Sequence, residues 1–167
     1  MKVILLRHGV AEDQRAGRPD SARRLTAEGR EKLRPVLERA RGAGVKPGLI
    51  LASPYARAME TAGMASDVLK APKAVASDAL LPSSSPERVW AELRAHADQD
   101  CVLLAGHEPL FSETASFLLG CSRIVLEVKK GAMLCIEVNA SANAPRGVLC
   151  WLITPRIATA AQQRPGG

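Results

Sequence analysis

The chain has 167 residues, 47% of them hydrophobic, and carries a net charge of +6. This length predicts one domain with a single hydrophobic core that needs neither a metal ion nor disulfides for stability. With only two Trp, one Tyr and two Phe, the chain has little to stack on bases, so nucleic acid is not expected as a partner. No apolar stretch reaches the roughly 20 residues that a membrane span requires.

The start of the chain and its cysteines indicate where the protein works. Met1-Lys2-Val3 passes directly into an apolar run, without the charged leader and cleavage site of a signal peptide, so we expect a cytoplasmic protein. Cysteines stand at positions 101, 121, 135 and 150, in apolar settings and without a Cys-x-x-Cys pair. We expect them to be buried free thiols, and we predict neither a metal site nor a cofactor.

Short apolar runs alternate with helical patterns along the chain, which is typical of an α/β domain. The expected strands, in chain order, are 2–7, 48–52, 73–76, 101–105, 132–138 and 148–153. The expected helices begin at Thr26, Pro54, Pro86 and Pro109. The fully apolar runs predict strands covered on both faces, and the last two strands form an antiparallel pair at one edge. The expected fold is a three-layer α/β/α sandwich with one mixed, mainly parallel sheet.

Smaller features set the expected limits of these elements. The domain is expected to span residues 1–154, and the tail 155–167 has little to bury and is expected to be disordered. Pro35 lies inside the first helical pattern and predicts a kink or a break there. Ser53 precedes the second helix and is expected to cap it.

Positive charge is concentrated between residues 15 and 41, which hold nine Arg or Lys and four Asp or Glu, a balance of 9 − 4 = +5. One interpretation is an ordinary solvated helix face. The other is a rim that attracts a phosphorylated or acidic partner. The sequence leaves both open.

Arg7, His8 and Gly9 follow the first strand directly, at the edge of the sheet where open α/β domains keep their chemistry. A guanidinium offers a planar fork of donors to phosphate oxygens, an imidazole attacks or carries protons near neutral pH, and glycine lets the backbone approach an anion. Arg57 follows the second strand, and His107 follows the strand 101–105. We expect these side chains to converge on a phosphoryl-binding site.

These motifs resemble those of the histidine phosphatase superfamily, and in particular the small bacterial phosphohistidine phosphatases of the SixA type. The resemblance is carried by the following motifs: Arg7-His8-Gly9, Ser53-Pro54-x-x-Arg57-Ala58, Arg24-Leu25-Thr26 with Gly29, and Gly106-His107-x-Pro109. It extends from about residue 2 to about residue 154. It implies a phosphoglycerate mutase-like fold and catalysis by a histidine that accepts the phosphoryl group covalently.

Carried over to this chain, the resemblance makes His8 the nucleophile and gives Arg7, Arg57 and His107 the task of binding the phosphoryl oxygens. Many relatives carry an acidic proton donor after the third strand, where this chain reads Ala-Leu-Leu-Pro-Ser at 79–83. An alkoxide leaving group needs that proton more than an imidazole does, so the departure favours a phosphohistidine substrate.

Five further residues are candidates for contact with the substrate. Glu12 and Glu108 could each supply a proton, or be ordinary solvated carboxylates. Gly9, Arg24 and Lys130 could bind substrate, although Arg24 could instead serve the following helix and Lys130 a surface turn.

The sequence thus predicts a cytoplasmic phosphatase that hydrolyses a phosphoryl group through phosphorylated His8, with phosphohistidine in a protein as the preferred substrate. A small-molecule phosphate ester phosphatase or mutase of the same superfamily is one alternative. A module that binds phosphorylated proteins without cleaving them is another. We expect a monomer or a weak dimer.

Overall fold

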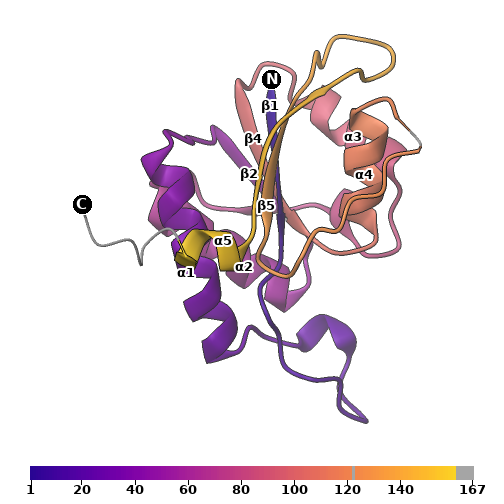
Figure 1. Ribbon diagram of the computed structural model, residues 1–167. Helices are drawn as coiled ribbons and strands as arrows, with labels where there is room; N and C mark the ends of the chain where they lie inside the picture. Colours follow the sequence, from indigo (N-terminus) through magenta and orange to yellow (C-terminus); the bar gives the residue numbers. More distant parts are fainter. Residues whose placement is uncertain (122, 161–167) are drawn as a thin grey trace, which may run out of the picture.

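Six strands form one mixed sheet through the centre of the computed structural model, which describes residues 1–121 and 123–160 (Figure 1). The strands are β1 (Lys2–Arg7), β2 (Leu49–Ala52), β3 (Val75–Ala76), β4 (Cys101–Gly106), β5 (Met133–Glu137) and β6 (Val148–Ile153). Their order across the sheet is β3-β2-β4-β1-β5-β6. Strands β1 to β4 run parallel to one another, β5 runs antiparallel to β1, and β6 runs antiparallel to β5. The predicted mainly parallel sheet with an antiparallel edge is confirmed.

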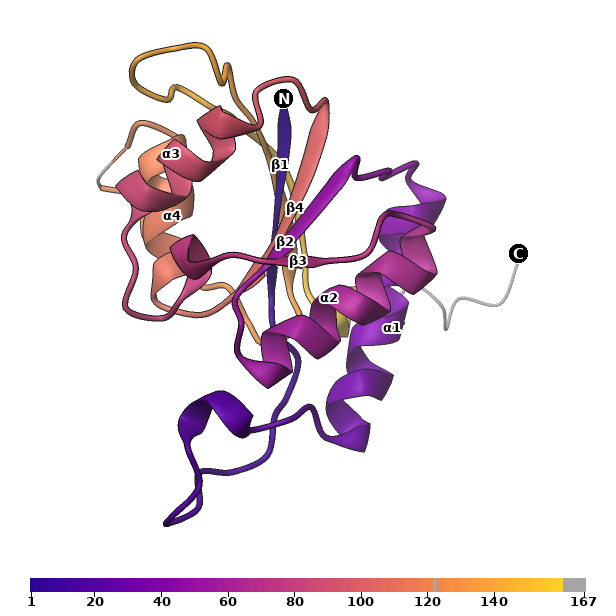
Figure 2. The same ribbon diagram turned by 180° about the vertical axis from the view of Figure 1, so that it is seen from behind.

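Helices cover both faces of this sheet (Figures 1 and 2). On one face lie α1 (Ala27–Gly42), α2 (Ala56–Leu69) and α5 (Pro155–Ala160), and on the other lie α3 (Pro86–Ala95) and α4 (Leu110–Leu118). Because successive side chains of a strand point to opposite faces, β1 supplies Val3 and Leu5 to the core under α3 and α4. Ile4 and Leu6 enter the other core, under α1 and α2. Both layers therefore hold β1 in the middle of the molecule, with its carboxyl end fixed.

Two expectations about the elements were wrong. Helix α1 continues through Pro35, so the break that was one of the two expected effects does not occur. Proline inside a helix costs about 3 kcal/mol, but α1 fully buries Leu33, Val36 and Leu37, each worth about 1.5–3 kcal/mol, so packing outweighs the proline. In the tail, residues 155–160 form α5, which packs on α1 and buries Ala158. Residues 161–167 lie outside the described part of the chain. Over the described residues, none of the helices combines the length and apolarity needed to span a bilayer.

In the connection from β1 to α1, the backbone at position 29 packs so closely against a neighbouring segment that only glycine fits. Thr26 begins α1, as expected, and its Oγ1 accepts a hydrogen bond from the N–H of Gly29 at 2.9 Å. Gly29 lies against the segment that follows Gly9, and a Cβ on it would stand 2.1 Å from the carbonyl oxygen of Val10. No real Cβ tolerates that separation, so the backbone would have to move.

We therefore expect Gly29→Ala to lower the free energy of unfolding by about 3 kcal/mol, the upper range for an overpacked site. Chemical denaturation followed by circular dichroism measures this. Gly63→Ala is the matched control, because a Cβ at Gly63 in α2 meets nothing within 4 Å, and alanine should there be neutral or slightly stabilising. Equal stabilities of the two variants would contradict the proposed role of Gly29.

Candidate active site

The carboxyl ends of β1 and β4 lie side by side and bring two histidines together. Arg7 at the end of β1 pairs with Gly106 at the end of β4. His8 and His107 follow these residues directly, and their ring centroids lie 5.1 Å apart. Parallel pairing thus joins two segments about 100 residues apart in sequence at one point.

The imidazole of His8 is held so that its unprotonated ring nitrogen faces Arg57. Its Nδ1 lies 2.7 Å from the carbonyl oxygen of Gly9. A carbonyl only accepts, so Nδ1 carries the proton and the lone pair of the neutral ring is on Nε2. Nε2 faces Arg57, whose Nε donates to it at 3.3 Å. This is the orientation that a nucleophilic histidine requires.

Burial and neighbouring charges keep both histidines neutral. Burial lowers the pKa of His8 to about 4; the hydrogen bond to Gly9 opposes the shift, and the charges of Arg57, Arg7 and Lys130 add to it. Burial likewise lowers the pKa of His107 to about 3, with further contributions from His8 and Arg57. At neutral pH His8 therefore has its lone pair available.

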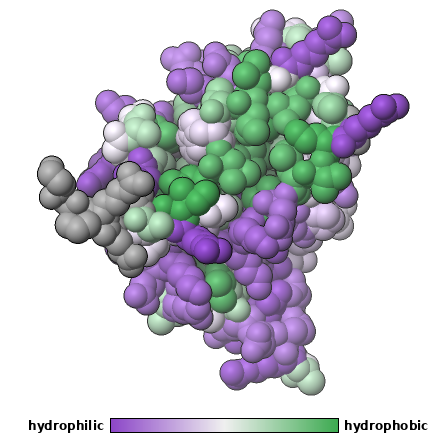
Figure 3. All heavy atoms as spheres, viewed as in Figure 1, coloured by the Kyte–Doolittle hydropathy of each residue, from purple (hydrophilic) through white to green (hydrophobic). Residues whose placement is uncertain are grey.

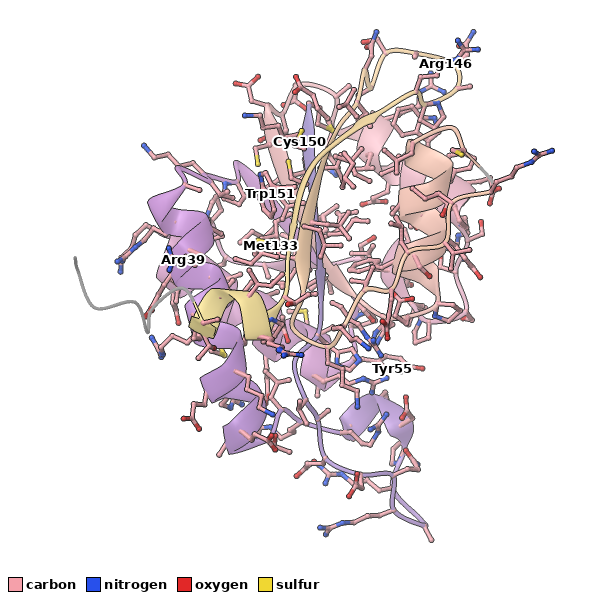
Figure 4. The ribbon with its side chains drawn as sticks, viewed as in Figure 1. Arg39, Tyr55, Met133, Arg146, Cys150 and Trp151 are labelled. Atoms are coloured by element: carbon pink, nitrogen blue, oxygen red, sulfur yellow. The ribbon has the colours of Figure 1, made fainter. Side chains whose placement is uncertain are left out.

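Arg57 is the most tightly fixed cation of the site. Only 4% of its surface is exposed, and its guanidinium carbon lies 4.9 Å from the centre of the Tyr55 ring. Figure 4 shows Tyr55 at the carboxyl end of the sheet, near the segment that follows β1. Stacking on an aromatic face and hydrogen bonding through the fork together fix a guanidinium in one orientation.

Asp20, a site residue that sequence analysis missed, holds the outer side of this guanidinium. Arg57 donates from Nη1 to the carbonyl oxygen of Asp20 at 2.8 Å and from Nη2 to its Oδ2 at 2.9 Å. Asp20 begins a short 3₁₀ helix, η1 (Asp20–Ala22). Burial alone would raise the pKa of Asp20, but hydrogen bonds and charges from Arg23 and Arg57 outweigh it and lower the pKa. The carboxylate is therefore ionised beside the cation.

Two buried nitrogen atoms of the site have no partner among the described residues: Nε of Arg7 and Nδ1 of His107. The rest of each side chain is anchored. Arg7 donates from Nη1 to the carbonyl oxygen of Val128 at 2.7 Å, and Nε2 of His107 lies 2.9 Å from Oγ of Ser53. Buried polar groups rarely go without partners unless they serve a function, and nitrogen donors at this point suit an anion.

Ser53 does not cap α2 as expected. Tyr55 holds the N-cap position without a side-chain hydrogen bond. The Ser53 hydroxyl lies within hydrogen-bonding distance of His107 and also accepts the N–H of Tyr55 at 3.4 Å, so it connects the site to the start of the helix.

Three of the remaining candidates lie at the site. Gly9 anchors His8 through its carbonyl oxygen, and its N–H donates to Oγ1 of Thr61 at 3.2 Å. Lys130 precedes β5, and its positive charge helps to lower the pKa of His8. Glu108 follows His107, its Oε1 is buried without a described partner, and its charge counters the effect of burial, which lowers the pKa of Arg7.

Glu12 and Arg24 are engaged elsewhere. The Glu12 carboxylate accepts the N–H of Arg24 at 3.0 Å and pairs with Arg18 at 2.9 Å. The Arg24 side chain pairs with Glu60 and is largely exposed. Neither side chain has a recorded contact with His8 or His107, because both serve the polar segment between β1 and α1. Polar side chains cover this lower part of the molecule (Figure 3).

Glu60 clamps this segment onto α2, one turn after Arg57. Its carboxylate accepts the N–H of Leu25 at 2.8 Å and Nη2 of Arg30 at 2.7 Å, and it also pairs with Arg24. Its side chain is only 15% exposed. The clamp therefore fixes the segment that carries Asp20 beside the helix that carries Arg57.

We expect Glu60→Ala to raise KM several-fold with a smaller effect on kcat, because Asp20 then loses its fixed position beside Arg57 while His8 keeps its own contacts. Steady-state kinetics measures both parameters. Glu28→Ala is the control, since Glu28 forms only an exposed pair with Lys32 on α1, and such pairs contribute little. Unchanged kinetics for Glu60→Ala would show that the segment keeps its position without the clamp.

Comparisons with known proteins agree with this geometry. The family model described as histidine phosphatase superfamily (branch 1) matches residues 3–81. The solved structure of the protein histidine phosphatase SixA complexed with tungstate has a TM-score of 0.83 and 28% sequence identity, covering 93% of this chain and 98% of that one. An uncharacterized protein of Picosynechococcus is 28% identical over 144 residues, which are 84% of this chain and 87% of that protein.

The fold is also shared with a phosphatase of another name. The α-ribazole phosphatase of Shigella flexneri has a TM-score of 0.71 at 17% identity, covering 93% of this chain and 97% of that one, a likeness of fold alone. The chain matches the histidine phosphatase superfamily model over residues 3–81, and it is similar to SixA in both sequence and fold. The resemblance inferred from the motifs is confirmed.

Proposed function

We propose that this phosphatase removes phosphoryl groups from phosphohistidine in a protein, through a covalent intermediate on His8. The observation that carries the proposal is the orientation of His8. Its Nδ1 is fixed by the carbonyl oxygen of Gly9, so its Nε2 lone pair points at the Arg57 guanidinium. A phosphoryl group bound by that guanidinium lies where Nε2 can attack it.

In the first step, Nε2 of His8 attacks phosphorus, and the bond from phosphorus to the leaving nitrogen breaks as the new P–N bond forms. Arg57 and Arg7 neutralise the charge on the equatorial oxygens. The unpartnered Nε of Arg7 and Nδ1 of His107 are additional donors for these oxygens. The substrate imidazole is protonated on its other ring nitrogen by solvent, so it departs neutral when the P–N bond breaks.

In the second step, water attacks the phosphorylated His8, the P–N bond to Nε2 breaks, and inorganic phosphate leaves. Asp20 holds the Arg57 guanidinium in place during this step, and the protons of the attacking water stay on the departing phosphate. His8 returns to the neutral form with its lone pair on Nε2. Dividing the transfer into two displacements replaces one difficult reaction by two easier ones.

The surroundings of the site support phosphohistidine as the substrate. In the segment 79–83, which has no carboxylate, Ala79 and Leu80 are buried apolar side chains. Asp78 just before them is exposed and lies in a separate surface pocket, together with Arg88 of α3. Asp20 is ionised and is therefore a poor proton donor. An imidazole, with a pKa near about 6.5, leaves with less help than an alkoxide does.

One observation favours the alternative of a small phosphate ester. Oε1 of Glu108 is buried beside the site without a described partner, and a protonated carboxyl group there would be a proton donor for an alkoxide. This alternative predicts that Glu108→Gln loses activity on esters and keeps activity on phosphohistidine.

A substrate panel tests the proposal. The wild type and His8→Ala are given a phosphohistidine-bearing phosphocarrier protein, an aryl phosphate and several sugar phosphates, and released phosphate is measured. We expect the wild type to have its highest kcat/KM on the phosphoprotein and His8→Ala to be inactive on all of them. Higher kcat/KM on a sugar phosphate would overturn the assignment of substrate. Binding of the phosphoprotein without hydrolysis of any compound would favour a binding module.

The pH dependence follows from the lowered pKa of His8. Catalysis requires the neutral imidazole, and in the folded protein His8 stays neutral down to about pH 4. After correction for ionisation of the substrate, kcat/KM should stay level from pH 7 to about 5 and then fall as His8 gains its proton. A fall centred near the ordinary histidine value of about 6.5 would show that burial does not control this group.

A further inference from the structure

The pairing of β5 with β6 contains an irregularity that places two cysteines together. Cys135 pairs with Trp151 and the next residue, Ile136, pairs with Leu149, so Cys150 is an extra residue in β6. In such a bulge, two residues of one strand oppose a single residue of the other. Cys150 is therefore adjacent to Trp151, the residue that pairs with Cys135. Figure 4 shows Cys150 and Trp151 next to each other on β6.

The two thiols differ in their access to solvent. Cys150 is exposed, whereas only 1% of the Cys135 surface is accessible. Exposure of Cys150, and of Cys121 in a different region, corrects the expectation that all four cysteines are buried. Cys150 is exposed because β6 is the edge strand, whose apolar pattern alone does not show that one side is open.

The environment of Cys135 indicates that the sulfur atoms are neighbours. Burial raises the pKa of Cys135 to about 12, and the Cys150 thiol is the next largest contributor to this shift. Cys135 is thus protonated at neutral pH and slow to react with peroxide in solution, since the thiolate is the reactive form. Reaction with an oxidant has to begin at exposed Cys150.

We propose that Cys135 and Cys150 form a reversible disulfide between β5 and β6 when the protein meets hydrogen peroxide. Peroxide oxidises the Cys150 thiol to a sulfenic acid, and one water molecule is released. The sulfur of Cys135 then attacks the Cys150 sulfur, the S–S bond forms, and a second water molecule leaves with the hydroxyl oxygen and the Cys135 proton. A dithiol reductant such as dithiothreitol reverses the reaction by thiol–disulfide exchange.

The disulfide would fasten the outermost strand of the sheet. Among the described residues, strand β6 pairs only with β5, and edge strands open more readily than central ones. A crosslink between Cys135 and Cys150 also restricts the unfolded chain. It lies away from His8, because β5 contributes Cys135 opposite Ile4, inside the sheet, rather than at the carboxyl end of β1. We therefore expect a rise in Tm with turnover unchanged.

The test uses the full chain, reduced and then treated with hydrogen peroxide. Peptide mapping without reductant should show one intramolecular Cys135–Cys150 disulfide in the monomer, reversed by dithiothreitol, and Tm should rise by about 5 °C. Cys150→Ser should abolish both effects. Cys121→Ser should retain them, since this second exposed cysteine lies outside the sheet.

Three outcomes would overturn the proposal: a disulfide joining two chains through Cys150, a disulfide that joins Cys135 to Cys101 instead, or a Cys150 that ends as sulfinic acid with Cys135 still reduced. The test depends on Cys150→Ser and not on a variant of Cys135, because a substitution at an exposed position does not disturb the core.

Discussion

His8→Ala is expected to reduce phosphate release by at least about 1,000-fold, the typical cost of removing a covalent nucleophile. Water would have to attack the substrate directly, without the imidazole whose lone pair faces Arg57. The fixed cations stay in place, so the variant should still bind inorganic phosphate as a competitive ligand. Rapid quenching of the wild type with labelled substrate should trap label on the protein that is stable in base and lost in acid.

His96→Ala is the matched control. His96 ends α3, partly exposed and facing Glu92 on the same helix, and its loss should leave turnover unchanged. His107→Ala is expected to retain the covalent label while turning over more slowly, since the role proposed for His107 is that of a donor and not of the nucleophile. Full activity of His8→Ala would mean that another residue attacks phosphorus, and the mechanism would have to be abandoned.

The geometry of the four principal residues follows from features that are visible in the sequence. Arg7 and His8 follow an apolar run, and His107 follows another. Parallel strands that are buried on both faces pair edge to edge, so residues just beyond their carboxyl ends must meet. Arg57 follows a third such strand after one turn. The local sequence determines whether a segment is a strand or a helix and where each residue stands in it. The convergence of these four residues could therefore be predicted.

Asp20 and Glu60 could not be found in the same way. Asp20 stands in a polar, arginine-rich segment in which no periodicity fixes the direction of any side chain. Its contact with Arg57 depends on the path of that segment, which in turn depends on the clamp at Glu60. Long-range pairing of charged side chains leaves no local pattern, because many Asp–Arg and Glu–Arg pairs are possible between residues 15–41 and α2.

Glu12 is a candidate that the sequence suggested and whose contacts the sequence could not predict. Its position soon after His8 suggested a proton donor, yet its carboxylate binds the N–H of Arg24 and the side chain of Arg18. Glu12 lies close to His8 in sequence, but its carboxylate is held by hydrogen bonds to other residues of the same loop. Glu108 is just as near to His107 in sequence, but its Oε1 is buried without a described partner, a difference that the sequence does not show.

Arg57→Lys should lower kcat/KM by about 100-fold even though it preserves the charge. Lysine offers one compact ammonium group, so it cannot donate to His8 and to Asp20 at once as the guanidinium does. It also lacks the flat face that lies over Tyr55. Arg57→Ala should cost about ten times more, because the charge that stabilises the transferring phosphoryl group is then gone as well.

Competitive inhibition by inorganic phosphate separates binding from catalysis in these variants. If Arg57 acts mainly in the transition state, its loss should lower kcat more than it weakens inhibition by phosphate. Arg39→Ala serves as the control for general loss of positive charge, since Arg39 lies on the outer side of α1 away from the site (Figure 4). If Arg57→Lys stays within about threefold of the wild type, charge alone suffices and the fork held between His8, Asp20 and Tyr55 has no catalytic role.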